Sequence, residues 1–459
     1  MKVHLETMGC QMNRLDSELV IGALRAAGHE LIDDRCDADV VLYNTCSVRR
    51  HAEQKVYSRL GADGKRKANH RPRLIVGVLG CMAQREGETL REKYPQVDIV
   101  CGPGQIHALA EMISAAAAGQ KAVALDPGRK DARDEDSEGR MDQMDLSRDV
   151  YAGAESGQAY VRITRGCDNF CSYCIVPYVR GPERSREPAH IAEEARRLVE
   201  AGRSEITLLG QTVNSYRWAA GETSVRFSDL LEKVAGIDGL RRLRFVTSHP
   251  RGFGDDVLQA MRDLPNVCEY IHCPAQSGSD AMLNAMNRGY SRADYDELVD
   301  RARDIVPGVV LAGDFIVGFP GETEQDHQAS SALIRRSGYK NSFVFKYSPR
   351  PGTLAARQLV DDVSEQVKKR RNNELLAVQA EVGLQHHRGY IGQTVEVLVE
   401  GPSPRAARQQ VASPPDCTQL VGRTRGDHIV VFDGPLSLAG QYVEVHIKDA
   451  TSLTLIAQR

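Results

Sequence analysis

Three cysteines near the middle of the chain have a spacing that suits an iron–sulfur cluster. Cys167, Cys171 and Cys174 form a CxxxCxxC run within a short, mostly polar segment. Three thiolates can hold three irons of a cubane cluster and leave the fourth iron without a protein ligand. A closed four-cysteine cluster passes electrons, whereas an open iron can bind a substrate. The alternating stretch before the run, Tyr160–Ile163, predicts a strand that leads into the cysteine loop.

Zinc is the alternative occupant of such a cysteine group. A structural zinc ion takes four nitrogen or sulfur ligands, commonly from two CxxC or CxxH pairs. The triplet at 167–174 has no fourth cysteine or histidine close to it in the sequence. The spacing therefore favours an iron–sulfur cluster with one open iron.

A second group of cysteines follows predicted strands in the first hundred residues. Cys10, Cys46 and Cys81 stand 36 and 35 residues apart, each in a polar or glycine-containing loop after an apolar run. Strands that alternate with helices predict a parallel sheet, and loops at the carboxyl ends of parallel strands meet at one edge. Three thiolates could therefore converge on a second cluster. Each could instead be a small buried residue at a strand end, and spacing does not exclude Cys101 as a ligand.

The composition places limits on the class of protein. The 459 residues are 41% hydrophobic and 26% charged, with a net charge of −3 and eleven cysteines. This length suggests about three domains. No apolar run is long enough to span a membrane, and Glu6 lies where a signal peptide needs an apolar core, so we expect a cytoplasmic protein. An odd cysteine count in a reducing compartment favours metal ligands or free thiols.

Because the net charge is negative, any contact with RNA must come from a local patch. One candidate is Arg49–Arg73, which holds nine Lys or Arg and only two acids. The same pattern is equally typical of a solvated helix face followed by a loop.

The elements that would position the CxxxCxxC loop alternate as strands and helices from residue 158 to about 347. Six apolar runs predict a partial β/α barrel, in which the chemistry lies at the carboxyl ends of the strands. The runs span residues 160–164, 205–209, 243–246, 267–272, 309–317 and 343–347. Residues 126–157 before them are predicted to be a charged, solvated linker, since eight acids and five bases lie between Arg129 and Asp149.

The C-terminal segment changes from a helix to short strands. A charged helix is predicted at Glu365–Arg388, and the alternating runs with glycine turns after it predict a small antiparallel β-barrel. From residue 384 to 459, seven Lys or Arg balance seven acids. An RNA contact would therefore depend on a local cluster; the candidates are Arg405, Arg408, Arg423 and Arg425. The alternative is a neutral barrel that packs against the core or a protein partner.

The chain resembles a known family over nearly its whole length. The string RGCDNFCSYCIVPYVRGPERSR at 165–186 is similar to the signature of methylthiotransferases, a branch of the radical S-adenosylmethionine (SAM) enzymes. ETMGCQMNRLDSE, VLYNTCSVRRHAEQK and VGVLGCMAQR resemble the three auxiliary-cluster segments of that branch. The resemblance implies two 4Fe–4S clusters: one on Cys167, Cys171 and Cys174 with exchangeable SAM, and one on Cys10, Cys46 and Cys81. Cys36 and Cys101 match no ligand position and are expected to be structural.

The family also implies a division of the chain and a SAM pocket. The expected units are an auxiliary-cluster domain at 1–125, the linker at 126–157, a radical SAM core at 158–384 and a TRAM domain, an RNA-binding barrel, at 385–459. Tyr173 is expected to lie against the adenine of SAM. Loop residues expected to line the same pocket are Gln211, Ser248 and Gly318.

Within the family, the chain is most similar to the MiaB branch, which acts on tRNA. Gln11-Met12-Asn13 after the first cysteine and the string SFVFKYSPRPGT at 342–353 carry this likeness. The branch that modifies a ribosomal-protein aspartate (RimO) typically has Pro-Lys there, and the threonylcarbamoyladenosine branch (MtaB) has Lys-Val.

The MiaB resemblance implies a reaction on isopentenyladenosine beside the tRNA anticodon. A radical from SAM would remove hydrogen from carbon 2 of the adenine, sulfur carried on the auxiliary cluster would be inserted, and a second SAM would supply the methyl group. The partners implied are the anticodon loop and an external electron donor of the flavodoxin or ferredoxin type, with the chain acting as a monomer. The alternatives are a ribosomal-protein methylthiotransferase and, more distantly, a non-catalytic iron–sulfur protein that carries electrons or binds RNA.

Overall fold

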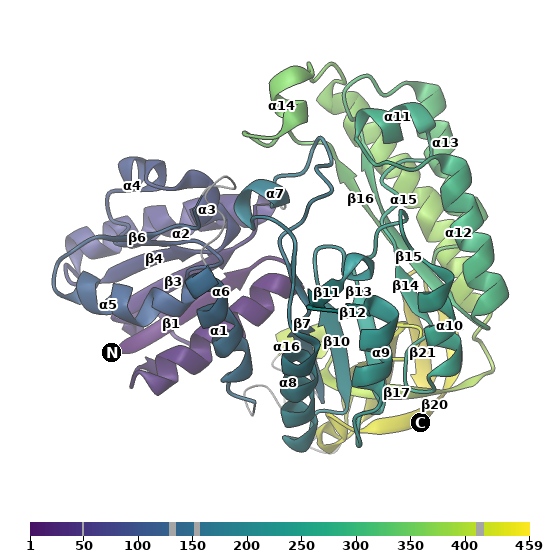
Figure 1. Cartoon of the computed structure of the whole chain (residues 1–459), viewed down its shortest axis with the longest axis horizontal. Coiled ribbons are helices and arrows are strands. Elements are labelled where there is room, and N and C mark those ends of the chain that lie inside the picture. The colour runs from purple at the N-terminus through teal and green to yellow at the C-terminus, as the bar shows by residue number, and fades with distance from the viewer. Residues whose placement is uncertain (48–49, 128–134, 151–156, 410–416) are drawn as a thin grey trace.

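The computed structural model describes residues 1–47, 50–127, 135–150, 157–409 and 417–459 (Figure 1). Along the described chain, a six-stranded sheet is followed by two three-stranded sheets and then by a closed five-stranded barrel. Figure 1 shows the first sheet with its helices on one side of the molecule and the other two parts on the opposite side.

The N-terminal sheet is parallel throughout, as predicted, with strand order β2-β1-β3-β4-β5-β6. The strands are β1 (Lys2–Met8), β2 (Glu30–Leu31), β3 (Val40–Thr45), β4 (Ile75–Leu79), β5 (Ile99–Cys101) and β6 (Ala122–Ala124). Every residue of β3 and β4 is buried, because a parallel sheet is covered by helices on both faces and its strands are therefore nearly continuous apolar runs.

Two separate apolar clusters cover the two faces of this sheet. Helices α1 (Gln11–Ala26), α5 (Leu109–Ala117) and α6 (Glu135–Leu146) contribute to one cluster. Helices α2 (Arg50–Asn69), α3 (Cys81–Glu86) and α4 (Thr89–Lys93) contribute to the other. The helices thus leave the carboxyl ends of the strands as the edge from which the loops emerge.

Helix α6 overturns one prediction. We expected a solvated linker at 126–157, but Met141 and Met144 are buried in the cluster under the sheet, and Asp145 is fully buried. The many charged residues predicted a solvated segment, because composition does not show which residues elsewhere in the chain pair with these acids. Asp145 bonds to Arg162 and Arg165 of the neighbouring strands, so over residues 141–146 the solvated-linker prediction is wrong.

The central part has the six predicted strands in two parallel sheets, ordered β13-β10-β7 and β14-β15-β16. They are β7 (Gln158–Arg162), β10 (Glu205–Leu209), β13 (Arg242–Val246), β14 (Tyr270–His272), β15 (Val310–Val317) and β16 (Asn341–Lys346). A parallel bridge between Leu243 and Val267 joins the two sheets into one curved array. The array is an open barrel, and the predicted partial β/α barrel is confirmed.

Helices cover the outer face of this array, and smaller elements decorate its loops (Figure 1). The covering helices are α8 (Pro188–Glu200), α9 (Phe227–Ala235), α10 (Asp255–Asp263), α12 (Arg292–Ile305), α13 (Glu324–Ser337) and α15 (Glu365–Arg388). The short helices α7 (Val176–Val179), α11 (Asp280–Ala285) and α14 (Leu354–Gln358) lie in the loops, with α7 beside α3 of the N-terminal part. The short strand pairs are β8 (Thr164–Arg165) with β9 (Arg184–Ser185), and β11 (Arg217–Ala220) with β12 (Thr223–Arg226). None of the described helices is long and apolar enough to cross a bilayer.

The C-terminal part closes into a barrel in the order β17-β18-β19-β21-β20. The strands are β17 (Thr394–Pro402), β18 (Thr418–Arg423), β19 (Ile429–Gly434), β20 (Tyr442–Ala450) and β21 (Thr454–Gln458), with α16 (Pro404–Gln409) after β17. The predicted small barrel is confirmed, although the β19–β21 pair is parallel rather than antiparallel.

The C-terminal barrel docks on the central part through charged contacts. Arg244 of β13 donates hydrogen bonds to the carbonyls of Thr424 and Arg425, at 2.5 and 2.6 Å. Arg425 in turn pairs with Glu269 at 2.6 Å. These contacts place the 424–428 turn of the barrel against the amino-terminal ends of the central strands.

These docking contacts overturn part of the arginine cluster that was predicted to contact RNA. Arg425 is paired with Glu269, and Arg423 is paired with Glu400 and Asp427. Both arginines therefore serve the fold, as the packing alternative required. Arg405 is exposed on α16, and the side chain of Arg408 lies outside the described residues.

Candidate active site

Cys10, Cys46 and Cys81 follow three adjacent strands of the N-terminal sheet. Cys10 caps α1 after β1, Cys46 follows β3, and Cys81 begins α3 after β4. Since the strand order is β1-β3-β4, their loops meet at one edge. The Cys46 thiol donates a hydrogen bond to the Cys10 sulfur, and Cys10 is close enough to Cys81 to affect its ionisation. The structure thus brings together the three cysteines that the sequence singled out.

The thiols of Cys10 and Cys81 have opposite electrostatic environments. The hydrogen bond from Cys46, together with the nearby Arg180, lowers the pKa of Cys10 to about 5. Burial raises the pKa of the Cys81 thiol, although Arg180 opposes this effect. The glycine before Cys81 is required, because Gly80 has a φ of +85° and a Cβ there would lie 2.5 Å from the side chain of Asn44.

The remaining N-terminal cysteines have different surroundings. Cys101 is fully buried at the end of β5, where its thiol donates to the carbonyl of Gly102 at 3.5 Å. Burial raises the pKa of Cys101, as it does the pKa of Cys81. Cys36 is exposed in a short 3₁₀ turn at Arg35–Asp37.

The CxxxCxxC triplet lies in the loop after β8, and side-chain donors point at its sulfurs. Arg288 donates to the Cys171 sulfur at 3.1 Å, and Asn169 donates to the Cys167 sulfur at 3.4 Å. Burial, followed by the neighbouring Cys171, raises the pKa of Cys174 to about 12. N–H groups aimed at sulfur stabilise thiolates bound to iron, so these donors fit a ligand role for the triplet.

The separation of the sulfurs distinguishes a cluster from a single ion. Sulfurs around one zinc ion, bonded at about 2.3 Å in a tetrahedron, stand ~3.8 Å apart. Among the described residues, neither cysteine set has all three sulfurs within 4.8 Å of one another. This spacing favours a multi-iron cluster over a single zinc ion at both places, since a cluster holds its thiolates on separate metal atoms.

Arg180 joins the two cysteine sets. It follows α7, the short helix after the CxxxCxxC loop, and its Nε donates to the Cys81 sulfur at 3.2 Å. Its Nη2 donates to one carboxylate oxygen of Asp16 at 2.9 Å, and Arg162 donates to the other oxygen, also at 2.9 Å. Asp16 lies on α1, the helix that begins directly after Cys10. Its buried carboxylate therefore links the Cys10 loop to the loop that carries the triplet.

Sequence reasoning missed Arg180, Arg288 and Asp16 as site residues. Arg180 lies inside the signature string at 165–186, which was one available indication. Arg288 lies 117 positions from the cysteine it contacts, and no spacing pattern pointed to it.

Backbone strain also marks this region. Five non-glycine residues of the described chain have a positive φ, and four of them lie in loops around the cysteine triplet. They are Phe170 within the triplet, Thr247 after β13, Gln276 after β14, and Asn287 beside Arg288. Strained backbone persists where the surroundings enforce it, and such residues concentrate at functional sites.

The four residues predicted for a SAM pocket are placed as follows. Tyr173 packs edge-on against Phe319, with the ring centroids 6.5 Å apart. Gln211 is half-buried beside Thr212, whose hydroxyl accepts from Asn169. Ser248 is buried, and its hydroxyl has no hydrogen-bond partner within the described chain.

Gly318, the fourth residue, serves a contact within the chain. It has a φ of +71°, and a Cβ there would lie 2.2 Å from Lys368 of α15. Its N–H donates to the carboxylate of Glu322 at 2.7 Å. The close approach that this glycine permits is therefore to α15.

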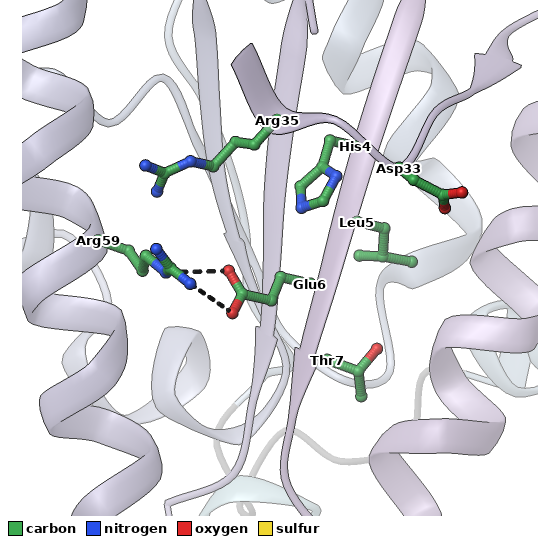
Figure 2. Close-up of a pocket in the computed structure, with 7 residues that line it drawn as sticks. All are labelled: His4, Leu5, Glu6, Thr7, Asp33, Arg35 and Arg59. Atoms are coloured by element: carbon green, nitrogen blue, oxygen red, sulfur yellow. Dashed lines mark hydrogen bonds and ion pairs between the residues drawn. The ribbon is translucent and has the colours of Figure 1, made fainter. Parts of the chain in front are cut away.

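A pocket on the N-terminal sheet has no cysteine among its lining residues (Figure 2). Its lining comprises His4, Leu5, Glu6, Thr7, Asp33, Arg35 and Arg59. Figure 2 shows Arg59 directed at Glu6, and the two form an ion pair at 3.2 Å. Arg35 bonds to the Tyr43 hydroxyl. Since these charged groups already have partners within the chain, the pocket offers little free chemistry.

Comparisons with known proteins agree with this arrangement. Three family models match: Uncharacterized protein family UPF0004 at residues 2–102, the Radical SAM superfamily at 161–334 and the TRAM domain at 388–458. In fold, the chain is similar to the radical S-adenosylmethionine methyltransferase TsrM from Kitasatospora setae. The TM-score is 0.56 at 16% identity, over 77% of this chain and 74% of that one. The fold and the cysteine loops thus define a radical SAM enzyme with a TRAM barrel.

Full-length relatives narrow this class. The tRNA-2-methylthio-N(6)-dimethylallyladenosine synthase of Rhodopirellula baltica is 48% identical over 99% of this chain and 95% of its own length. The enzyme of the same name from Syntrophotalea carbinolica is 42% identical over 99% of both chains. The chain therefore belongs to the family of tRNA-2-methylthio-N(6)-dimethylallyladenosine synthases, the MiaB family.

Proposed function

We propose that this chain converts isopentenyladenosine (N6-dimethylallyladenosine) beside the tRNA anticodon into its 2-methylthio derivative. The observation that carries the proposal is the junction between the two cysteine-bearing loops, where Cys81 packs in one buried cluster with Ile175 and Val179, which follow the CxxxCxxC triplet. Arg180 spans that junction. Full-length similarity to enzymes named for this reaction supports the substrate.

We propose that each cysteine set holds one 4Fe–4S cluster. The donor sets fit, because each offers three soft thiolate ligands more widely spaced than one zinc ion requires. When bound at Cys167, Cys171 and Cys174, the reduced cluster together with SAM supplies a carbon radical able to remove hydrogen from an unactivated C–H bond.

The protein's own residues prepare the site for this chemistry. Arg288 and Asn169 hold the Cys171 and Cys167 sulfurs through N–H donors. Burial of Cys167 and Cys171 and partial burial of Cys174 limit water, which would otherwise quench a reactive carbon radical. On the other side, Arg180 holds Cys81 at a fixed place relative to the triplet.

The SAM pocket is proposed around the loops at the carboxyl ends of the central strands. Tyr173 would lie against the adenine, and Gln211, Ser248 and the Gly318 loop would line the remaining walls. Ser248 supports this placement best, since its buried hydroxyl has no partner in the described chain and would gain one from a polar ligand atom.

The target base must leave its stack to reach a buried site. Anticodon-loop bases can splay outward, and enzymes that act on a base read it in a pocket after extrusion. We propose that the units at 1–125, 158–384 and 385–459 carry sulfur transfer, radical formation and RNA binding respectively. We further propose a cytoplasmic monomer that receives electrons from a flavodoxin or ferredoxin.

The test is nucleoside mass spectrometry on tRNA from a host that lacks its own enzyme, with and without this chain expressed. The expected result is loss of isopentenyladenosine and appearance of methylthio-isopentenyladenosine. A Cys171→Ala chain expressed at the same level is the matched control, and it should leave isopentenyladenosine unchanged. If the wild-type chain, carrying both clusters, left the tRNA unmodified, the proposed substrate would be wrong.

A further inference from the structure

Strand β16 carries two exposed phenylalanines on one face. Phe343 is 53% exposed and Phe345 is 43% exposed. Side chains alternate along a strand, and the residues between and before them are covered. Ser342 is buried, and Val344 packs against the main core. One face of β16 is therefore satisfied, and the other presents aromatic rings to solvent.

The strand register identifies the face that bears these rings. Phe343 lies opposite Asp314 of β15, and Phe345 lies opposite Ile316. Asp314 bonds to His272 of β14 at 3.2 Å. The β15 residues that point to the opposite face, Phe315 and Val317, belong to the core beneath the helices. The two phenylalanines therefore point to the inner face of the open barrel.

This inner face is accessible because β16 is the last strand of the array. It pairs with β15 on one side only, and within the described residues no strand pairs with its other edge. Aromatic side chains left exposed to water have an unfavourable hydration free energy, and exposed apolar groups of this kind commonly mark binding surfaces.

The aromatic face lies between the C-terminal barrel and the cysteine loop. Before β16, Lys340 bonds to Asp427 of the barrel at 2.6 Å. After β16, Tyr347 packs on Phe319, which packs in turn on Tyr173 of the CxxxCxxC run. A polynucleotide held on the barrel and reaching for the cysteine loop would therefore pass this strand.

The geometry of the rings points to a flat ligand. Their planes are within 18° of parallel, with the centroids 6.2 Å apart. Unpaired bases stack on aromatic side chains, and each such contact contributes about 1–3 kcal/mol. We propose that Phe343 and Phe345 stack an unpaired nucleobase of the tRNA anticodon loop. This inference rests on the proposed function and adds the residues that hold the RNA.

The experiment measures binding of a labelled anticodon stem–loop that contains isopentenyladenosine, by fluorescence anisotropy, to the full chain with both clusters. From the stacking energy, Phe343→Ala and Phe345→Ala are expected to weaken binding, with an increase in Kd of roughly 5- to 150-fold for the residue that carries a base. Val360→Ala removes apolar surface from a side chain that is 81% exposed and carries no ring, and it should leave Kd unchanged.

Conservative variants separate stacking from general apolar contact. Phe343→Tyr and Phe345→Tyr keep the ring and should bind within about twofold of wild type, whereas Phe→Leu at the same positions should bind as weakly as Ala. Cleavage of SAM without RNA should be unchanged in all of these variants, which shows that the fold and clusters are intact. Full binding by the leucine variants would overturn the stacking inference.

The design also distinguishes this inference from the proposed function. If wild type binds and modifies the stem–loop while Phe343→Ala/Phe345→Ala binds equally well, the inference fails and the function stands. If the wild-type chain with both clusters does not bind the stem–loop, the proposed function on tRNA is contradicted, and the stacking inference falls with it. If the double variant instead loses only the capture of an aspartate-containing peptide, which could add a strand to the β16 edge, the nucleobase assignment is overturned.

Discussion

Replacing Asp145 with asparagine should destabilise the protein strongly, because this carboxylate neutralises buried cations. Asp145 is fully buried, and it accepts hydrogen bonds from Arg162 at 2.7 Å and from Arg165 at 2.6 Å. Arg186 lies 3.5 Å away. Asparagine preserves the shape of the side chain and removes only its charge. Two arginines would then lose a charge-assisted partner inside the protein.

The expected cost follows from the burial of the group. Removing one member of a buried ion pair costs about 3–5 kcal/mol, since the remaining charge stays desolvated. With a urea m-value near 3 kcal/mol/M, this loss would lower the unfolding midpoint by roughly 1–2 M. Glu193→Gln is the matched control, because Glu193 forms an ion pair with Arg196 in which both side chains are about half exposed. Such pairs contribute at most ~1 kcal/mol.

The effect should depend on pH with a definite sign. Although burial works against ionisation, Arg162, Arg186 and Arg165 hold the pKa of Asp145 well below its ordinary value. A depressed folded-state pKa adds stability above the unfolded value of 3.8, and that stability is lost as the pH falls. The gap between wild type and Asp145→Asn should therefore be full at pH 7 and narrow in acid.

The assay is urea unfolding followed by far-ultraviolet circular dichroism at pH 7 and at pH 3 or below, which lies under the unfolded pKa of 3.8. A midpoint shift of less than about 0.3 M at pH 7, similar to the Glu193→Gln control, would refute the reasoning. It would mean that α6 contributes no more than a solvated linker, which is what composition alone predicts for this segment.

Three further predictions concern the cysteine sets. Cys171→Ala should abolish cleavage of SAM by the reduced protein and retain about half of the bound iron; cleavage at the wild-type rate would contradict the ligand assignment. Cys46→Ala should spare cleavage of SAM and stop methylthiolation, as measured by nucleoside mass spectrometry, and an unchanged product yield would exclude the second cluster. Arg180→Met removes an N–H donor and a positive charge from Cys81, so it should make the auxiliary cluster harder to reduce; Arg288→Met should shift only the other cluster. Redox titration followed by electron paramagnetic resonance tests both, and equal shifts at the two clusters would contradict the assignment.

The sequence predicted the fold well where the hydrophobic residues follow one clear pattern, that of a strand or that of a helix. The parallel strands of the first sheet and the six strands of the open barrel are apolar runs that end in loops, and strand β10 at Glu205–Leu209 matches its predicted run. Helix α15 at Glu365–Arg388 was also predicted with its observed bounds. The prediction failed for α6, because its apolar side is only two methionines and its acids are neutralised by residues elsewhere in the chain.

The cysteine ligands of the site could be predicted from the sequence, but the side chains that hold these cysteines in place could not. Cysteine spacing and the ends of the apolar runs indicated both cysteine sets, because the sequence shows where each predicted strand ends. The donors to sulfur are not visible in the sequence, since Arg288 contacts Cys171 across 117 positions and Arg180 contacts Cys81 across 99. Such pairings depend on tertiary packing, which no local pattern records. For the same reason Arg423 and Arg425, which resemble a basic cluster in sequence, are engaged within the fold.

The Asp16 carboxylate explains how two loops from separate sheets can be placed with the accuracy that this chemistry needs. One of its oxygens accepts from Arg180, which follows the CxxxCxxC loop, and the other accepts from Arg162 of β7, which precedes it. Asp16 itself lies six residues after Cys10. A shift of either cysteine set would therefore break a buried, charge-assisted hydrogen bond. Because an error of about 1 Å between reacting groups can cost ~100-fold in rate, a rigid link of this kind is worth its desolvation cost.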